Sequence, residues 1–315
     1  MKFGVFLPIS GRAASSVLMD AARAAEAAGY DSVWAADRIV IPWEIRTPYP
    51  YKEDRQFLVP PDRPFLEPLT CLAFLAGGTE RIALGMSVLV LPYRHPLHWA
   101  KIATTIDHLS RGRLILGVGV GWMVEEFEAL GAPFKERGAA SDEQLELLER
   151  LWTDERCQFA GRHYRFTDIA FYPKPLQSPR VPIWVGGEGA RAQRRAARYG
   201  DAWFPYFVRI TPRELSARFD EVRRGAAEAG RDPERLSLNC CLPVDLTAEP
   251  APQSEDRLRG TPEQLVVALR AFQKAGVEHM ALQFMMPSWR ERALQIERFA
   301  REVMPALRDT AARPA

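Results

Sequence analysis

The sequence predicts an α/β protein of the (β/α)8 TIM-barrel class, on two observations. Eight short apolar runs alternate with eight segments of helical periodicity. Regular alternation of strands and helices is typical of a parallel sheet covered by helices. The length of 315 residues fits a barrel of about 250 residues with insertions. We therefore expect residues 1–315 to form a single barrel domain.

Each predicted strand is a short apolar run that ends at glycine, proline or polar residues. The eight runs cover residues 2–8, 31–36, 81–91, 113–118, 181–185, 202–204, 236–246 and 277–284. An open doubly wound sheet is the alternative, since Gly117, Gly119 and Gly121 follow a strand. A dinucleotide fingerprint, however, requires glycine where this chain has Trp122. The barrel is the better interpretation.

The predicted helices follow these strands and begin at recognisable caps. Their ranges are 15–28, 67–78, 96–109, 141–152, 190–199 and 289–303, with two more starting after positions 211 and 261. The segments Thr211-Pro-Arg-Glu and Thr261-Pro-Glu-Gln have the form of capping boxes. In a capping box the side chain of the first residue accepts from the backbone amide of the fourth, and the side chain of the fourth accepts from the backbone amide of the first. Ser141 and Gln144 have the same spacing and predict a helix start at Ser141.

Charge and composition exclude several classes of function. Lys and Arg number 42 against 40 Asp and Glu, a net charge of +2, which provides no general surface for nucleic acid or anionic membranes. The longest apolar stretch, residues 82–91, is about half of a bilayer span. No signal-peptide pattern opens the chain, so we expect a cytoplasmic protein. The cysteines, Cys71, Cys157, Cys240 and Cys241, lack the spacing of a metal site and are expected to be reduced.

Two insertions interrupt the alternation. Residues 38–68, here called the lid segment, follow the second strand and contain seven prolines and five aromatic residues. In a barrel this position lies over the catalytic face, so the segment is expected to form an ordered lid. Residues 156–179 carry aromatic residues around Gly161 and predict an extra hairpin before the fifth strand.

Candidate functional residues are those that follow the strands, because barrel active sites lie at the carboxyl ends of the strands. Most of these positions hold glycine, aromatic or small apolar residues, which suits a flat apolar ligand. Gly186 and Gly187 stand between a strand and a helix, where backbone amides can approach a phosphate. A plain tight turn explains them equally well, and Glu188 puts a carboxylate beside the same place. His95 follows the third strand and is a candidate acid or base, although a structural role is the simpler interpretation.

The helix at 190–199 presents a basic face of Arg191, Arg194, Arg195 and Arg198. A solvated outer surface explains this face, and an anionic cofactor tail or a subunit contact is the alternative.

Four segments resemble the bacterial luciferase-like oxidoreductases, and within them the subgroup dependent on coenzyme F420. They are GMSVLVLPYRHP (85–96), RLILGVGVGW (113–122), PIWVGG (182–187) and RRAARYGDAW (194–203). The resemblance implies a (β/α)8 barrel, usually dimeric, that binds F420, or alternatively FMN, with its ring at the strand ends and its phosphate near the Gly-Gly turn.

The resemblance also assigns residues. It implies a non-proline cis peptide at Ser87-Val88 behind the ring. It implies cofactor contacts from Asp37, Ser87, Val88, Val120, Gly121, Gly186 and Gly187, and a substrate-side Trp43. Many F420 enzymes of the family have Asp-His after the second strand, where this chain has Asp37-Arg38. Arginine stays protonated and cannot act as a base, so Arg38 is expected to bind an anionic substrate or a developing oxyanion.

The sequence thus predicts an oxidoreductase that transfers a hydride between F420 and a small organic substrate, with Arg38, Trp43 and His95 as candidate catalytic residues and no metal. An FMN monooxygenase supplied by a separate reductase, and a flavin- or F420-binding protein without turnover, are the alternatives. A phosphosugar lyase or isomerase needs a base such as a glutamate or lysine at a strand end, and no lysine is found there. The expected partners are a small-molecule substrate and a second copy of the chain, with a separate flavin or F420 reductase as an additional candidate, and without nucleic acid or membrane.

Overall fold

Eight parallel strands close into a barrel in the computed structural model, which describes residues 1–11, 14–52, 54–206, 210–252, 257–286 and 288–308. The barrel strands are β1 (Lys2–Phe6), β2 (Ser32–Ala35), β3 (Ala83–Met86), β5 (Leu114–Gly119), β8 (Ile183–Gly186), β9 (Ala202–Phe204), β10 (Ser237–Leu246) and β12 (Val277–Phe284). Neighbours pair in this order, β12 pairs with β1, and β9 pairs with β10. The sheet is therefore closed, and the predicted barrel is confirmed.

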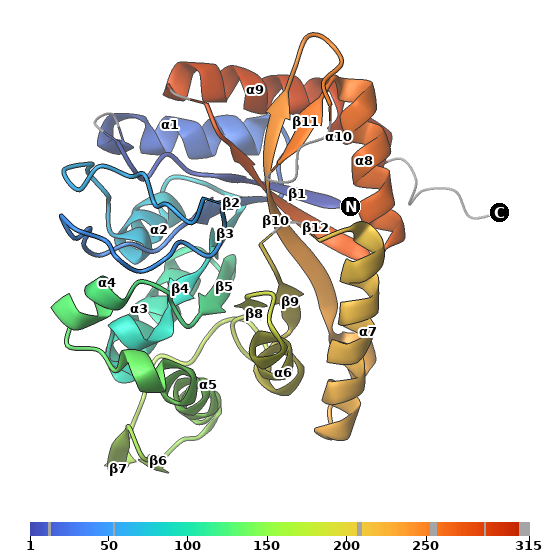
Figure 1. Ribbon diagram of the computed structural model, residues 1–315. Coiled ribbons are helices and arrows are strands. Elements are labelled where there is room, and N and C mark those ends of the chain that lie inside the picture. Colours follow the sequence, from blue (N-terminus) through green and yellow to red (C-terminus); the bar gives the residue numbers. More distant parts are fainter. Residues whose placement is uncertain (12–13, 53, 207–209, 253–256, 287, 309–315) are drawn as a thin grey trace.

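Helices surround the barrel (Figure 1). They are α1 (Ala14–Ala27), α2 (Pro68–Ala76), α3 (Pro96–Leu109), α4 (Val124–Ala129), α5 (Arg137–Thr153), α6 (Ala190–Tyr199), α7 (Pro212–Glu228), α8 (Pro262–Lys274), α9 (Trp289–Glu302) and α10 (Met304–Arg308). Short 3-10 turns occur at Leu91–Tyr93, Phe134–Glu136 and Pro233–Arg235. Most of the apolar core lies between these helices and the outer face of the barrel.

Both predicted insertions are present. The described residues between β2 and α2 form no regular helix or strand and lie beside the carboxyl ends of the barrel strands (Figure 1). The second insertion forms an antiparallel hairpin of β6 (Cys157–Ala160) and β7 (Arg165–Ile169). Two further short strands flank the barrel: β4 (Leu89–Val90) pairs with β5, and β11 (Leu258–Gly260) pairs with β10.

Two details of the prediction are wrong. The run at 81–91 is not one strand, since it is divided into β3 and β4 at the Ser87-Val88 peptide. The capping box at Ser141 does not exist, because α5 begins at Arg137 and the Ser141 hydroxyl donates to the Arg137 carbonyl within the helix, at 2.7 Å. Gln144 instead accepts from the buried Trp99 indole at 2.9 Å, so a tertiary contact uses the side chain that the local pattern assigned to a cap.

The capping boxes at Thr211 and Thr261 are confirmed, and each begins its helix at the following proline. All four cysteines are buried and free. No helix of the described residues is both long enough and apolar enough to span a bilayer.

The interior of the barrel is filled by aromatic side chains. Trp34, Trp184 and Phe204 pack against one another with ring centroids 5.0 to 5.2 Å apart. Beneath them the His279 imidazole lies 2.7 Å from the Ser32 hydroxyl, and burial lowers the pKa of His279 to about 3. Because this packing fills the barrel, a ligand has to lie above it, at the carboxyl ends of the strands.

Candidate active site

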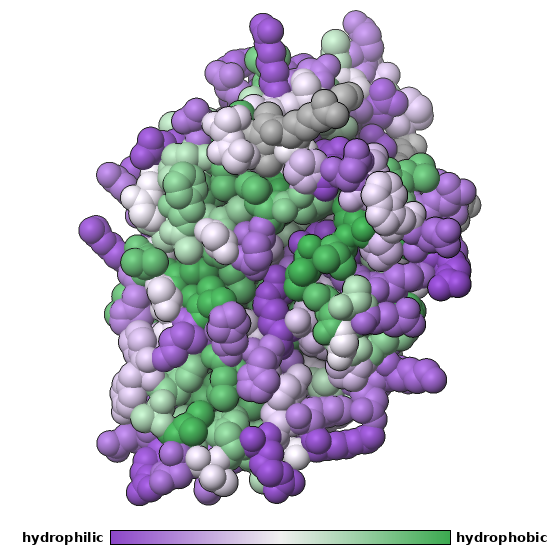
Figure 2. Space-filling model, turned by 90° about the vertical axis from the view of Figure 1, so that its left-hand side faces the viewer, coloured by the Kyte–Doolittle hydropathy of each residue, from purple (hydrophilic) through white to green (hydrophobic). Residues whose placement is uncertain are grey.

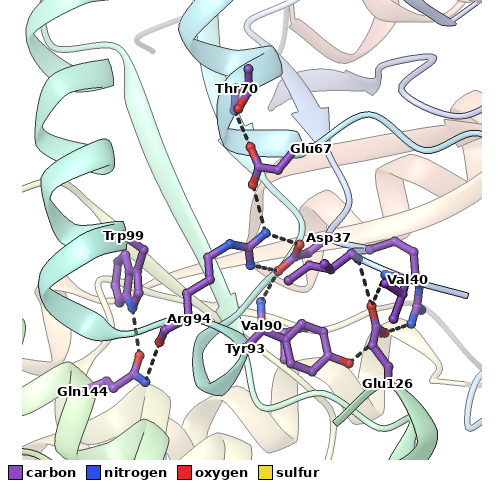
Figure 3. A network of polar contacts seen from close by, with 12 residues as sticks. Asp37, Val40, Glu67, Thr70, Val90, Tyr93, Arg94, Trp99, Glu126 and Gln144 are labelled. Atoms are coloured by element: carbon purple, nitrogen blue, oxygen red, sulfur yellow. Dashed lines mark hydrogen bonds and ion pairs between the residues drawn. The ribbon is translucent and has the colours of Figure 1, made fainter. Parts of the chain in front are cut away.

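Asp37, just beyond β2, is held in an ion pair rather than left open to a ligand. Its carboxylate accepts from both terminal nitrogens of Arg94, at 2.7 and 2.9 Å, and from the Val90 amide at 2.9 Å. Arg94 also donates to Glu67 at 2.9 Å, the residue that caps α2 (Figure 3). A bidentate pair of this kind fixes direction as well as distance. Asp37 therefore ties the end of β2 to β4 and the start of α2, and its predicted cofactor contact stays a prediction.

Arg38 pairs with a buried carboxylate. Its guanidinium donates to Glu126 of α4, which has no exposed surface. The same carboxylate accepts from the Tyr93 hydroxyl at 2.9 Å and from the amides of Ile39 and Val40 at 2.9 and 3.2 Å (Figure 3). The charge of Arg38 is therefore compensated within the protein, and the sequence did not indicate Glu126 as its partner.

A second carboxylate of α4 holds the next part of the lid segment. Glu125 accepts from the Arg46 amide at 2.7 Å and from the amide and hydroxyl of Thr47 at 3.0 and 2.7 Å. Although burial raises the pKa of Glu125, these hydrogen bonds lower it overall. Adjacent carboxylates on α4 thus fasten both ends of residues 38–47.

Aromatic side chains of the lid segment gather over the barrel mouth. The Trp122 ring, which follows β5, lies 5.1 Å from Tyr49 and 5.5 Å from Phe57. Tyr51 lies 5.1 Å from Tyr206, which follows β9. The Arg38 guanidinium lies 5.1 Å from the centre of the Phe57 ring and 5.7 Å from that of Trp122. The lid segment therefore contributes an aromatic cover between the ends of β5 and β9.

Figure 2 views the face on which the lid segment lies, and apolar patches there are separated by hydrophilic side chains. Among the exposed apolar residues of the segment are Leu58 and Trp43, which is 83% exposed. His95 is exposed at the start of α3, with its ring edge against Tyr164 at 5.8 Å. In the described part of the chain, no hydrogen bond, ion pair or ring contact joins Arg38, Trp43 and His95 to one another. Their catalytic roles stay predictions.

The Ser87-Val88 peptide is cis, as the resemblance implied. Its surroundings explain the glycines of β5 and β8. A Cβ on Gly119 would lie 2.5 Å from Val88 Cγ2, and one on Gly186 would lie 2.8 Å from Val88 Cγ1. The Val88 side chain therefore sits in a cradle between the two strands that only glycine leaves open. Val120 and Gly121 follow β5 at the same mouth, so uncharged residues adjoin the Val88 cradle along the chain.

The turn after β8 has the geometry of an anion site. Gly187 has φ +104°, its carbonyl accepts from the Trp203 indole at 2.9 Å, and a Cβ there would lie 2.9 Å from that of Ala192. Gly189 then caps α6 with no side-chain hydrogen bond, and a Cβ there would meet nothing within 4 Å. The first amides of a helix have no partner within it, so an anion can approach these through open space.

Arg137 and Arg191 bring positive charge near the start of α6. Arg137 donates to the Gly121 carbonyl at 3.2 Å. Its pKa is lowered by burial and by the positive charge of Arg191 in the first turn of α6. Of the predicted basic face, Arg195 is withdrawn into an ion pair with Asp142 at 2.6 Å.

Glu188 does not oppose such an anion directly. Its carboxylate accepts from the Tyr206 amide at 2.8 Å, so it is directed toward the end of β9. Burial raises the pKa of Glu188, although the hydrogen bond from Tyr206 opposes the shift. Burial therefore makes ionisation of Glu188 less favourable than that of an exposed glutamate.

The chain matches the description luciferase-like monooxygenase over residues 1–253. It belongs to the luciferase-like monooxygenase family. Among its relatives are a phthiodiolone/phenolphthiodiolone dimycocerosates ketoreductase of Mycobacterium kansasii, 32% identical, and an F420-dependent glucose-6-phosphate dehydrogenase of Nakamurella multipartita, 31% identical. The matches cover 81% of this chain and 71% of the ketoreductase, and 84% of this chain and 72% of the dehydrogenase.

The fold is shared with a solved F420-dependent secondary alcohol dehydrogenase in complex with an F420-acetone adduct. The TM-score is 0.79 at 20% identity, over 98% of this chain and 99% of that one. The relatives of this luciferase-like chain therefore include F420-dependent enzymes.

Proposed function

We propose that this luciferase-like protein is an oxidoreductase that transfers a hydride between coenzyme F420 and a carbonyl compound or the corresponding alcohol. The observation that carries the proposal is the Val88 side chain in its cradle between Gly119 and Gly186, next to the turn at Gly187. Together they suit a cofactor with a flat ring and a phosphate. F420 supplies a hydride donor at its deazaflavin carbon, and the protein contributes binding and orientation.

The choice of F420 over FMN is supported by the glucose-6-phosphate dehydrogenase relative and by charge. F420 carries an anionic tail beyond its phosphate, and Arg191 in the first turn of α6, whose charge also reaches Arg137, would provide positive charge near that turn. The choice of a carbonyl substrate is supported by the ketoreductase relative, and the aromatic cover of Tyr49, Phe57 and Trp122 suits an apolar molecule.

The test is a titration of the purified protein with F420 and with FMN, each oxidised and reduced, followed by fluorescence and calorimetry. We expect tighter binding of F420. A preference for FMN would overturn the hydride-transfer proposal in favour of an oxygen-dependent monooxygenase with a partner reductase, and binding of neither would remove the redox proposal altogether. The homodimer stays a prediction.

A further inference from the structure

The lid segment is fastened to the barrel on both sides of its aromatic residues. On the first side, the amide and hydroxyl of Thr47 donate to Glu125 of α4 at 3.0 and 2.7 Å. On the second side, the Leu66 amide donates at 2.9 Å to the carbonyl of Ile9, which lies in the loop after β1. These two places are here called the anchors, and the described residues between them, 48–52 and 54–63, are called the flap. Any displacement of the flap therefore pivots at the two anchors.

Contacts within the flap hold it in shape. The Tyr49 amide donates to the Arg55 carbonyl at 2.8 Å, and the Arg55 amide donates to the Lys52 carbonyl at 3.2 Å. The Tyr49 ring lies 5.4 Å from the Tyr51 ring and 5.3 Å from the Phe57 ring. Where the flap lies over the mouth is therefore decided by its contacts with the barrel.

The flap packs on the barrel at two aromatic contacts. Tyr49 and Phe57 lie 5.1 and 5.5 Å from Trp122, which comes just before α4 and so adjoins the first anchor. Tyr51 lies 5.1 Å from Tyr206, which follows β9. In the barrel β9 is separated from β5 by β8, and from β1 by β10 and β12. The Tyr206 contact is therefore the one remote from both anchors, and a rotation of the flap separates it first.

Tyr206 is itself held by the barrel. Its hydroxyl donates to Gln283 of β12 at 3.0 Å, and its backbone forms a parallel bridge with Cys241 of β10. Tyr206 and Val88 both pack against the cluster of aromatic side chains that fills the barrel. Tyr51 therefore docks on a fixed partner at the same mouth as the Val88 cradle, next to which the cofactor ring is proposed to lie.

We propose that the contact between Tyr51 and Tyr206 is a latch, which holds the flap closed over the barrel mouth. The flap opens by separating these two rings while both anchors stay in place. The closed flap keeps water from the mouth, and the open flap admits and releases ligands. The latch is argued from contacts within the protein, whereas its effect on cofactor exchange rests on the proposed F420 function.

The anchors serve less well as the place of opening. Release at the first anchor would break the three hydrogen bonds that Glu125 accepts from Arg46 and Thr47. Release at Tyr206 separates one pair of partly buried rings. An aromatic pair contributes a factor of about two to twelve to an equilibrium constant beyond the area that it buries. Loss of the latch should therefore raise the population of the open flap by about that factor.

The test removes each side of the latch in turn. Tyr51→Ala removes the ring of the flap, and Tyr206→Ala removes its partner while the flap itself stays unchanged. Tyr51→Phe keeps the ring and is the conservative control. Leu58→Ala is the matched control within the flap, because the Leu58 side chain is 68% exposed.

The first readout is limited digestion with trypsin and requires no cofactor. Arg55 in the flap and Arg46 at the first anchor are both exposed, so one digest reports on both. Cleavage of a folded protein follows the population of the locally open form when opening and closing are fast. Cleavage after Arg55 should quicken about two- to twelve-fold in Tyr51→Ala and in Tyr206→Ala, and cleavage after Arg46 should not. Both controls should match wild type.

The double variant separates the latch from contacts inside the flap. Tyr51→Ala should add little to the cleavage rate in the Tyr206→Ala background, because the two rings act through one contact. Unchanged cleavage after Arg55 in Tyr206→Ala would overturn the latch, even if Tyr51→Ala were cleaved faster. Equal acceleration after Arg46 and Arg55 would overturn it too, since the whole lid segment or the whole fold would then be opening.

The second readout is the rate of F420 dissociation, measured by stopped-flow fluorescence. Dissociation should be about two- to twelve-fold faster from Tyr51→Ala and Tyr206→Ala than from wild type, Tyr51→Phe and Leu58→Ala. Equal rates from all five proteins would overturn the role of the latch in ligand exchange. If wild type failed to bind F420 while the digests gave the expected pattern, the latch would stand and the proposed function would fall. If F420 bound normally and cleavage after Arg55 never changed, the proposed function would stand and the latch would fall.

Discussion

Gly119→Ala should destabilise the protein through a single identifiable contact. The new Cβ would lie 2.5 Å from Val88 Cγ2 and 3.5 Å from Val88 Cβ. The first distance is about 1 Å shorter than an ordinary carbon contact, so Val88 or its backbone must shift. Overpacking of this kind costs about 1–3 kcal/mol. Because Val88 belongs to the cis peptide on which the ring is proposed to rest, F420 affinity should fall together with stability.

A double-mutant cycle isolates this contact. Val88→Ala removes Cγ2, so Gly119→Ala should cost much less in the Val88→Ala background than in wild type. Gly117→Ala is the contrasting case, since its Cβ would lie 1.9 Å from the Met86 carbonyl oxygen and truncation of Val88 gives no relief. Gly77→Ala is the matched control, with an ordinary φ of −79° and its nearest atom at 3.9 Å.

The assay is urea unfolding of the single and double variants, followed by F420 titration. Gly77→Ala should be neutral or stabilising by about 0.4–1 kcal/mol, because alanine restricts the unfolded chain. If Gly119→Ala proved as stable as Gly77→Ala, or if Val88→Ala left its cost unchanged, the cradle would not explain these glycines.

Three further predictions concern ion pairs and titration. Glu126→Gln leaves the nearly buried Arg38 without a counter-charge and should cost about 3–5 kcal/mol in urea unfolding. It should also open residues 38–47 to proteolysis, whereas the exposed Glu128→Gln on the same helix should do neither. Arg191→Ala should raise the F420 Kd about ten-fold or more through loss of a charge-assisted contact. Arg194→Ala, one turn further along α6, should leave the F420 Kd unchanged. Equal effects of the two substitutions on the F420 Kd would contradict an anion site at the start of α6. Lowering the pH below 6.5 should destabilise wild type by about 1.4 kcal/mol per pH unit, because only the unfolded state protonates His279 until the pH approaches 3. Urea curves at several pH values should show a smaller slope for His279→Gln and an unchanged one for the exposed His98→Gln.

The barrel was predictable because its signals are local and repeated. Apolar runs bounded by turn residues located all eight barrel strands, and the Thr211 and Thr261 boxes gave the starts of their helices. The failures occurred where a distant contact overrides a local pattern. Ser141 and Gln144 have the spacing of a cap, but Gln144 is required by the indole of Trp99, and the helix starts one turn earlier.

The candidate site was predictable in its glycines and not in its charges. Gly186 and Gly187 could be found because backbone geometry restricts those positions to glycine. Arg94 and Glu126 were missed because their ion-pair partners lie about 30 to 90 positions away along the chain. The pairing of each arginine with its carboxylate therefore depends on how distant loops come together. Sequence spacing gives no information on such pairs.

The unusual residues Arg38 and Glu188 become understandable when they are considered together. An arginine after the second strand needs a carboxylate, and α4 provides Glu126, which at the same time binds the backbone of the lid segment. Arg38 thereby fixes the lid segment. Glu188, in the turn after β8, accepts from the Tyr206 amide beyond the neighbouring strand, and burial raises the pKa of its carboxyl. A carboxylate next to the Gly187 turn would oppose a bound anion, and burial makes that negative charge less favourable than on an exposed glutamate.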